Sequence, residues 1–580
     1  MADEAIYTAI TFAPVQGFIE KSRKLRDLYG ASLILSYLSQ RIVLAADNPP
    51  NIKVISPANI NIQKGMPNRL LIKGDFTEDM ARDVLLNAWQ DILVVCRNWV
   101  EKKIPNEYQW EREWRHWGNH AWEIFWGRGD SIPSAMNDLE TRKLSRNWTA
   151  INWIGESSSL TGADGIAFPR LGGANRNPKE LTYRSEDDEI KSFYKALASI
   201  TDNLTEEDSP GDSEEDNLDS ETLPEGKFID SSEQLSILEL VKRLVTWKDV
   251  RDEIGKKFDV NNAFFESLPR GFKEIRRKPT ETESGQWTGW FMGDGDEVGK
   301  KLKQLADSEN GEEEIYTFTK KLRDWGKNFY QYFEREKKLG RVIYAGGDDF
   351  LGVIYSKNPK KPISGFSAFE WLTTLQSKWK EHRQDINVSV GFVWVAGSVP
   401  QRDILQHCRQ AQKTAKNLNR DRVTIRVVFN SGQYVEWTCP WDYLHILTSY
   451  KDRNDNTYAE WERRDRESKY EPNWTHVFSD LAQLKARHAF GLAENRRRKN
   501  VDADTVNQSK IIDNRRDFLK FFDIYFPDWE EILKKNEKWI VGASNDASST
   551  KRASLMIDWI EDLITIGWYL CSNTSSSLNL

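Results

Sequence analysis

The stretch "RVIYAGGDDFLGVIY", residues 341–355, decides how the fold of this sequence is interpreted. Two apolar runs with strand character flank four residues, Gly346, Gly347, Asp348 and Asp349, and this pattern predicts a β-hairpin. An Asn-Gly pair would make such a turn without placing two like charges side by side. The adjacent carboxylates therefore call for a reason other than turn formation.

A second acidic stretch upstream supplies that reason. In "QWTGWFMGDGDEVGKKLKQL", residues 286–305, a strand runs into a helix, and Asp294 stands at the end of the strand. A strand end and the hairpin of a neighbouring strand can be adjacent in a small sheet, so we expect Asp294, Asp348 and Asp349 to converge. Carboxylate clusters suit Mg²⁺ or Mn²⁺, and two such ions are the usual chemistry of nucleotidyl transfer. We predict that these three aspartates are catalytic and bind metal.

Three features predict contacts to a nucleotide. The paired hairpin glycines permit positive φ and the close approach of a ligand to the backbone. The segment "GDGDEVG", residues 293–299, leads into a helix whose free N–H groups can face a triphosphate. Two cations four residues apart on the end of one predicted helix share a face and can hold outer phosphates. The predicted nucleotide-binding residues are Gly295, Asp296, Gly299, Gly346, Gly347, Lys416 and Arg420.

Each of these patterns also has a structural interpretation. A Gly-Gly-Asp-Asp string alone is compatible with an ordinary solvated turn, and the matched Asp-Gly-Asp upstream is what favours a site. Lys416 and Arg420 taken alone are more often a solvated helix end than phosphate contacts. The basic string "ENRRRKN", residues 494–500, is more often a solvated segment than an RNA contact.

Composition bounds the class of protein. At 580 residues the chain exceeds what one hydrophobic core supports, so we expect three or four domains. The net charge of -7 excludes a generally basic surface, which makes any nucleic-acid contact local. Four scattered cysteines without a C-x-x-C pair predict neither a disulfide framework nor a cysteine zinc site, and they fit a cytoplasmic protein. No uncharged apolar run approaches the ~18 residues of a membrane span.

The predicted fold class is α+β, with two ferredoxin-like palm domains, a small mixed or helical domain between them and a helical C-terminal domain. Residues 1–150 form the first palm with a helical extension, and 151–283 the intervening domain, whose acidic loop 203–226 is predicted to be disordered. Residues 284–440 form the second palm, in the order β-α-α-β-hairpin-β-α-β-α-β. Residues 441–580 form the helical domain. The openings "ITFAPVQGFIEKSRKL" and "GWFMGDGDEVGKKL" resemble each other, which indicates a duplicated palm with acids only in the second copy.

The acidic hairpin, the Asp-Gly-Asp strand end, "INVSVGFVW" and "AQKTAKNLNRDRV" resemble the cyclase palm shared by diguanylate cyclases and the large subunit of type III CRISPR effector complexes. The N-terminal stretches "FAPVQGFIEKSRKLRDLYGASLILSYLS" and "GMPNRLLI" resemble the first palm of the CRISPR subunit, most closely its Cmr-type (III-B) form. The resemblance covers nearly the whole chain, with the C-terminal part matched only in character.

This resemblance implies an enzyme that joins ATP into cyclic oligoadenylates when its complex has captured target RNA. It implies Asp294, Asp348 and Asp349 as ligands of two Mg²⁺ or Mn²⁺ ions and Lys416 as a phosphate contact, whereas Arg420 follows the diguanylate cyclase pattern. The implied partners are other Cmr-type subunits, including the small subunit and the subunit that binds the crRNA 5′ end, together with crRNA and target RNA. No membrane partner is implied.

Two departures from the family pattern carry expectations. Many relatives begin with an HD nuclease domain, and this chain has neither that length nor a His-Asp pair, so no HD nuclease activity is expected. Relatives also hold zinc through cysteines between the palms. The comparable "WIGESSSLTGADG" has serines instead, so no zinc is expected and packing must hold the local fold.

Two alternative functions remain at the level of the sequence. The first is a non-catalytic scaffold of the ribonucleoprotein, suggested by the degenerate first palm and the missing HD domain. The second is a free-standing diguanylate cyclase. The stretch "RVIYAGGDD" lacks the aspartate of the R-x-x-D inhibitory site common in those enzymes, and the long N-terminal region also disfavours this assignment.

Overall fold

The structure, a computed structural model, describes residues 6–58, 65, 67–145, 153–174, 176–177, 186–203, 228–257, 277, 285–356, 358, 361–491 and 505–572. The predicted acidic loop, except for Asn203, and the basic string 494–500 lie outside these residues. The chain divides into two compact units. Unit 1 comprises Met1–Glu274, Gly299–Asn328 and Ile343–Gly347, and unit 2 comprises Ile275–Val298, Phe329–Val342 and Asp348–Leu580.

Unit 1 contains a four-stranded antiparallel sheet in the order β2-β3-β1-β4. Its strands are β1 (Tyr7–Ala13), β2 (Lys53–Ser56), β3 (Arg69–Lys73) and β4 (Glu123–Gly129). Strand β4 lies in the stretch predicted as a helical extension. Glycines weaken a strand signal, but Gly127 is needed here because a Cβ would lie 2.3 Å from the backbone nitrogen of Leu139 on the helix packed against β4.

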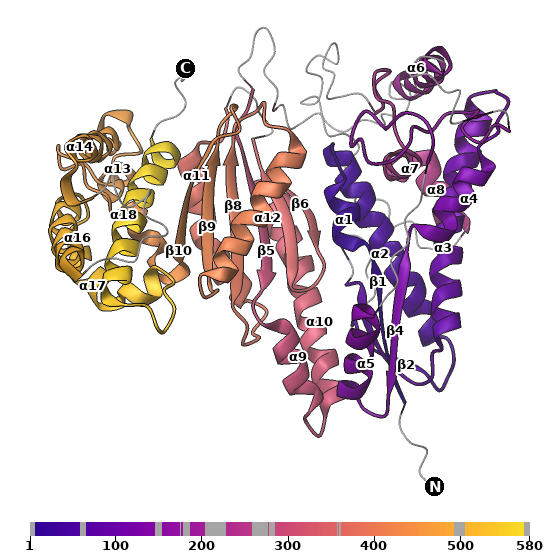
Figure 1. Ribbon diagram of the computed structural model, residues 1–580, viewed down its shortest axis with the longest axis horizontal. Helices are drawn as coiled ribbons and strands as arrows, with labels where there is room; N and C mark the ends of the chain where they lie inside the picture. Colours follow the sequence, from indigo (N-terminus) through magenta and orange to yellow (C-terminus); the bar gives the residue numbers. More distant parts are fainter. Residues whose placement is uncertain are drawn as a thin grey trace. The chain divides into compact units, whose positions relative to one another are not determined.

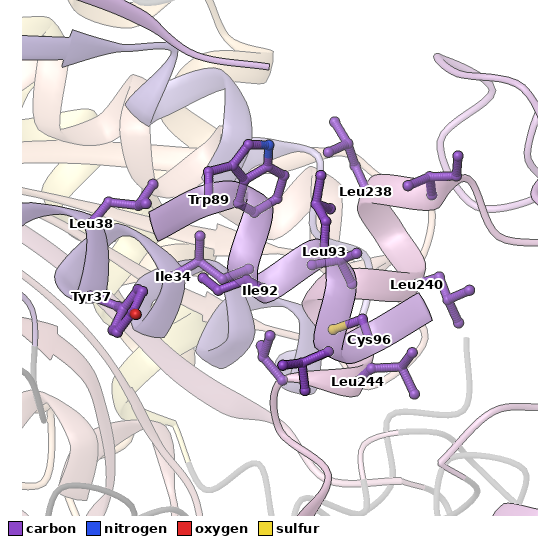
Figure 2. Close-up of a cluster of buried hydrophobic side chains, with 14 of the residues drawn as sticks. Ile34, Tyr37, Leu38, Trp89, Ile92, Leu93, Cys96, Leu238, Leu240 and Leu244 are labelled. Atoms are coloured by element: carbon purple, nitrogen blue, oxygen red, sulfur yellow. The ribbon is translucent and has the colours of Figure 1, made fainter. Parts of the chain in front are cut away.

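The helices of the N-terminal half surround a large apolar core. They are α1 (Val15–Glu20), α2 (Leu25–Asp47), α3 (Glu78–Lys103), α4 (Glu111–His120), α5 (Ile132–Leu144), α6 (Asp187–Asn203), α7 (Ile237–Leu244) and α8 (Lys248–Lys257). Figure 2 shows part of this core, where α2, α3 and α7 contribute Ile34, Leu38, Trp89, Ile92 and Leu240. The region predicted as an intervening domain thus shares its core with the first palm.

A buried ionic network fixes α7 to α2. The fully buried guanidinium of Arg243 donates to Asp27 at 2.6 Å and to Glu233 at 2.9 Å. Attraction by Asp27 and Glu233 outweighs burial and raises the pKa of Arg243. At Gly30 the two helices touch, because a Cβ there would lie 1.8 Å from the carbonyl oxygen of Lys242. Buried charges of this kind are tolerated only when they are paired.

Helix α2 is the one helix in the described ranges long and apolar enough to cross a membrane by length and composition. Of its most apolar window, 72% is buried within the chain. That degree of burial is typical of the core helix of a soluble fold.

The second predicted palm forms a six-stranded sheet in the order β10-β9-β8-β5-β7-β6 (Figure 1). Its elements are β5 (Thr288–Gly295), α9 (Val298–Ala306), α10 (Gly311–Tyr330) with a π-turn (Gln331–Glu336), β6 (Gly340–Ala345), β7 (Asp349–Ile354), α11 (Gly365–Lys380), β8 (Val388–Val395), α12 (Gln401–Asn417), β9 (Arg422–Val428) and β10 (Tyr434–Pro440). The predicted order is confirmed, and β10 extends it. Strands β8 and β9 pair in parallel, whereas β5 pairs with β7 and β8 antiparallel.

Helices α11 and α12 cover opposite faces of this sheet. A Cβ on Gly391 of β8 would lie 2.3 Å from the carbonyl oxygen of Cys408, so this residue faces α12. The next residue, Phe392, points to the other face and pairs with Phe291, whose ring packs on Trp371 of α11 at 4.7 Å between centroids. The face that carries α12 can therefore be followed along each strand by alternation.

The described part of residues 441–580 is helical, apart from one isolated bridge between Lys451 and Thr457. It contains α13 (Tyr458–Arg463), α14 (Thr475–Ala486), α16 (Thr505–Tyr525), α17 (Trp529–Ile540) and α18 (Ser549–Cys571), with short 3-10 turns at Trp441–Ser449, Ser468–Tyr470 and Ala489–Gly491. Helix α18 joins this region to the sheet, since the indole N–H of Trp559 donates to the carbonyl oxygen of Thr438 at 2.7 Å.

Candidate functional site

The register of β5 and β7 brings the predicted acidic residues together. Asp294 lies directly opposite Asp349, and the backbone N–H of Gly295 donates to the carbonyl oxygen of Asp348 at 2.8 Å. Facing residues of an antiparallel pair have Cβ atoms about 4.5–5.5 Å apart. Asp294 is on the α12 face, because Met292, two residues earlier, pairs with Gly391. The predicted convergence is present, and the role of the three carboxylates as metal ligands stays a prediction.

The crowding of negative charge changes the acidity of this cluster. The pKa of Asp348 is raised by the loss of hydration among surrounding atoms and by repulsion from Asp294. The same loss of hydration raises the pKa of Asp349, together with repulsion from Asp348 and Asp294. The Asp349 side chain still reaches solvent, so repulsion from Asp348 and Asp294 is the cause of its raised pKa that the geometry supports. A cation placed among these oxygens would relieve it.

One cation of the chain already meets the cluster. The ammonium of Lys416, at the end of α12, forms an ion pair with Asp294. Both side chains stay about one-third exposed, at 32% and 28%. Within the part of the chain that the structure describes, no three His, Cys, Asp or Glu side chains are grouped as ligands around one point. The donor set still fits Mg²⁺ or Mn²⁺, because all three candidate ligands are hard carboxylate oxygens that repel one another.

Asp296 holds the backbone behind the site. It is buried and accepts hydrogen bonds from the Ser389 hydroxyl at 2.7 Å and from the Asp421 N–H at 2.9 Å. Its pKa is nevertheless raised, because burial outweighs these bonds. The side chain thus connects the end of β5, strand β8 and the loop after α12. Sequence reasoning missed Ser389 and Asp421, since neither carries a motif by itself.

The predicted shared helix face of Lys416 and Arg420 is wrong. Helix α12 ends at Asn417, and the N–H of Arg420 donates to the carbonyl oxygen of Ala415 at 3.2 Å, as in a Schellman cap. Arg420 lies in a left-handed turn with φ 58°, between Asn419 and Asp421, which also have positive φ. Arg420 is exposed beyond the helix end, and its predicted contact to phosphate is not tested by this geometry.

Neither hairpin glycine, Gly346 or Gly347, has a positive φ, which corrects the expectation for the turn, and a close approach of another backbone accounts for Gly346 alone. A Cβ on Gly346 would lie 3.2 Å from the carbonyl carbon of Gly65, within unit 1. The buried Arg323 donates to the carbonyl oxygens of Gly65 and Gly346, the latter at 2.8 Å. Sequence reasoning missed Arg323, which lies in an unremarkable helical run.

The remaining two predicted glycines differ in their surroundings. Gly295 is enclosed, since a Cβ there would lie 2.9 Å from Val298 and 3.1 Å from the Cβ of Asp348. Gly299, in the first turn of α9, has open space at the corresponding position. Open space at a helix start is compatible with the predicted approach of a phosphate, which stays a prediction.

Two family models match this chain, one in each palm. Residues 288–424 match the model described as Cas10/Cmr2, second palm domain, and residues 7–63 match the model described as CRISPR-associated protein Cmr2, N-terminal. No curated protein sequence is significantly similar to the chain.

Several solved structures resemble the chain in fold. The Csm1-Csm4 cassette in complex with one ATP is 12% identical, with a TM-score of 0.44, and the match covers 98% of this chain and 70% of that chain. For the Csm1-Csm4 subcomplex in the type III-A CRISPR-Csm interference complex the identity is 13%, the TM-score 0.42 and the coverage 97% and 70%. For the Csm1-Csm4 cassette in complex with cA4 these values are 11%, 0.40, 97% and 70%.

The two matches identify residues 7–63 and 288–424 as palm-type segments of the Cas10/Cmr2 kind. Both matched segments are domains of Cas10/Cmr2, so the resemblance to the large palm-domain subunit of type III CRISPR effector complexes is confirmed.

Proposed function

We propose that this chain is the large subunit of a Cmr-type (III-B) RNA-guided antiviral complex and that it makes cyclic oligoadenylates from ATP when the complex holds target RNA. One observation carries the proposal. Asp294 and Asp349 face each other across β5 and β7, Asp348 is bonded through its backbone to Gly295, and Lys416 stands beside them. A solvated turn has no need of this convergence of three acids and one base.

In the proposed reaction the 3′-hydroxyl of one ATP attacks the α-phosphate of another. The new O3′–P bond forms as the bond between the α- and β-phosphates breaks, and pyrophosphate leaves. Repeated steps lengthen the chain, and attack by its terminal 3′-hydroxyl on its own 5′ α-phosphate closes the ring as a last pyrophosphate leaves. Bound Mg²⁺ or Mn²⁺ would polarise the hydroxyl and neutralise the leaving phosphate.

Residues of this chain bind the cations, contact the phosphates and position the loop after α12 in the proposed reaction. Asp294, Asp348 and Asp349 hold the cations, and Lys416 exchanges its contact with Asp294 for a phosphate oxygen of the bound nucleotide. Asp296 positions the loop that follows Lys416 through its bonds to Ser389 and Asp421. The exposed Arg420 extends from this loop toward solvent, where it can meet the outer phosphates.

The proposal includes the setting of the enzyme. The partners are the other Cmr-type subunits, among them the small subunit and the subunit at the crRNA 5′ end, with crRNA and target RNA. The complex acts in the cytoplasm, without a zinc ion in the part of the chain that the structure describes. The stretch 153–165 lacks the cysteines that the family resemblance implies, and it is closed by a Ser157–Gly165 bridge and a hydrogen bond from the Ser158 hydroxyl to Glu239 at 3.2 Å.

A scaffold without catalysis is the second candidate. Asp294 is paired with Lys416, and among the described residues no metal-ligand group is assembled. The buried network of Arg243, Asp27 and Glu233 also gives unit 1 the rigidity that a scaffold needs.

The deciding experiment is product analysis of the reconstituted complex with ATP, Mg²⁺ and complementary target RNA. We expect cyclic oligoadenylates from the wild type and none from the Asp348→Ala/Asp349→Ala variant, with crRNA loading unchanged. ATP binding without turnover under every RNA condition would establish the scaffold. A cyclic dinucleotide made only from GTP would establish a diguanylate cyclase.

A further inference from the structure

The exposed side of α12 carries a row of cations that the site does not use. Arg402, Arg409 and Lys413 are exposed, and Lys416 follows them at the end of the helix. At 3.6 residues per turn these four positions lie within about 60° of one another around the helix axis. They therefore form one stripe along the helix, here called the α12 stripe.

The charge of this helix departs from that of the chain. The whole chain has a net charge of -7, whereas α12 carries these four cations and a single acid, Asp403. Asp403 lies about 80° or more around the axis from each of the four. It accepts a hydrogen bond from Arg402 at 3.1 Å, and an exposed contact of this kind is weak. The stripe is thus a local basic surface on an acidic protein.

One end of the α12 stripe, at Lys416, reaches the carboxylate cluster. The buried side of α12, with Leu405 and Cys408, packs on the sheet. Arg409 and Lys416 lie within about 40° of Leu405 around the axis, at the border of that side, and Arg402 and Lys413 lie farther out on the same flank. The last member of the stripe, Lys416, pairs with Asp294 of β5. His407 lies on the opposite border of α12. Its Nδ1 is 3.1 Å from the guanidinium of Arg426 in β9, so that border faces β9. The cations consequently lie on the flank nearer β5 and end at the site.

The length of the α12 stripe favours a chain of nucleotides over a single nucleotide as its ligand. From Arg402 to Lys416 is 14 positions, or about 21 Å of helix at 1.5 Å per residue. One triphosphate held at Lys416 does not reach Arg402, so a single ATP leaves the outer cations without a phosphate. A chain of nucleotides with one anionic phosphate at each linkage can contact all of them.

We propose that the α12 stripe binds the phosphodiester backbone of the linear oligoadenylate that grows at the site, so that intermediates stay bound between additions. This inference rests on the proposed function and adds a binding surface for its intermediate. Retention by the stripe favours longer products, because an intermediate that dissociates early is released before the next addition or ring closure.

The test is a charge-reversal variant, Arg402→Glu/Arg409→Glu/Lys413→Glu, in the assembled complex. None of the three residues belongs to the site itself. Binding of 5′-triphosphorylated di-, tri- and tetra-adenylate is measured against binding of ATP, with Mg²⁺ and without turnover. We expect at least a tenfold loss of affinity for the tetra-adenylate, a smaller loss for the dimer, and a change of less than about twofold for ATP.

Salt dependence supplies a second readout. For single strands the slope of log affinity against log salt changes by about 0.7 for each phosphate contact, so the tetra-adenylate slope should fall by about 2. A matched control, Arg463→Glu/Lys469→Glu/Lys520→Glu, changes the net charge equally at exposed positions of the helical region. The control should leave both affinity and slope unchanged.

Three outcomes overturn the inference. The stripe has no such role if the variant binds the tetra-adenylate like the wild type, or if it loses ATP to the same degree. If target RNA binding weakens and oligoadenylate binding does not, the stripe serves RNA and the assignment is wrong. Because these are binding measurements, they separate from the failure of the proposed function, which a wild-type complex that makes no oligoadenylate would reveal.

Discussion

The two palms build the end of their central strand in different ways. In unit 1, β1 lies between β3 and β4, and its facing pair near the strand end is Thr11 with Arg69. The Asn68 side chain closes this end by donating to the Thr11 hydroxyl at 3.1 Å and to the carbonyl oxygen of Phe12 at 3.3 Å. In unit 2, β5 lies between β7 and β8, and the corresponding pair is Asp294 with Asp349.

The two strand ends differ in the electrostatic energy of their side chains. At the first strand end the Asn68 side chain donates hydrogen bonds to its neighbours, and Arg69 forms an ion pair with Glu140 at 2.9 Å. The second strand end gathers negative charges whose repulsion raises the pKa of Asp348 and Asp349. Like charges held together in this way are disfavoured in an empty protein and become favourable when a cation binds them. The same local fold therefore ends in hydrogen bonds from Asn68 in one copy and in a crowded carboxylate cluster in the other.

The largest expected effect comes from matched changes at the two strand ends. Asp349→Asn, which keeps the shape and removes the charge, should lower cyclic oligoadenylate synthesis by at least ~100-fold, because a ligand of the proposed cations is lost. Thr11→Val in the first palm should change it by less than about threefold. The rate of synthesis by the complex with target RNA measures both. Equal losses for the two variants would show that the comparison has no catalytic meaning.

The second expectation concerns the first palm as a structural unit. Arg243→Met leaves Asp27 and Glu233 without their buried partner and should cost about 3–5 kcal/mol of the free energy of unfolding. Denaturant unfolding of the full chain measures this, with the exposed Arg516→Met as control. A loss below about 1 kcal/mol would mean that the network contributes little to unit 1.

A smaller effect is expected at Asp296. In Asp296→Asn the amide nitrogen cannot accept one of the two hydrogen bonds from Ser389 and Asp421, so the loop after α12 loses a tether. We expect the KM for ATP to rise about tenfold with a smaller change in kcat, which marks a positioning role. A fall in kcat alone, with KM unchanged, would place Asp296 in the chemistry instead.

The smallest effect is a dependence of metal-free stability on pH. The pKa of Asp348 is raised to about 6 and that of Asp349 to about 7 from the ordinary value of 3.8. A carboxyl whose folded pKa is raised binds its proton more tightly in the folded chain, so its stabilising contribution is full below pH 3.8 and is lost as pH rises through 6 and 7. In chelator the melting temperature should fall by a few degrees between pH 5 and pH 8.

Two controls identify the source of that fall. Asp349→Asn should reduce it, whereas Asn in place of the exposed Asp546 should leave it unchanged. Mg²⁺ should abolish it in the wild type, since the cation neutralises the cluster. A melting temperature that rises over this pH range in chelator would contradict the direction of the shifts.

Local sequence patterns are sufficient to predict much of the fold and of the candidate site. Alternating apolar residues, turn glycines and helical periodicity predicted the order of elements from β5 to β9, and the spacing of Asp294 and the acidic hairpin predicted their convergence. Strand β4 escaped because glycines dilute its pattern, although they are what allows α5 to pack on it.

Other features depend on contacts distant in sequence. Asp27 and Arg243 are 216 positions apart, and neither is unusual in its own segment. The sequence predicts Arg420 on a helix because its spacing of four residues from Lys416 is helical. The chain leaves the helix through a left-handed turn that Asp296, in the turn after β5, stabilises by accepting a hydrogen bond from the Asp421 N–H. Tertiary hydrogen bonds, not local propensity, decide such positions.

We expect the facing carboxylates of the second palm to form a divalent cation site, and a Mn²⁺ titration followed by electron paramagnetic resonance measures that binding. The full chain in the presence of ATP should bind Mn²⁺ saturably, and Asp348→Asn/Asp349→Asn should lose that binding while Thr11→Val retains it. Identical Mn²⁺ binding by the double variant and the wild type would contradict this expectation.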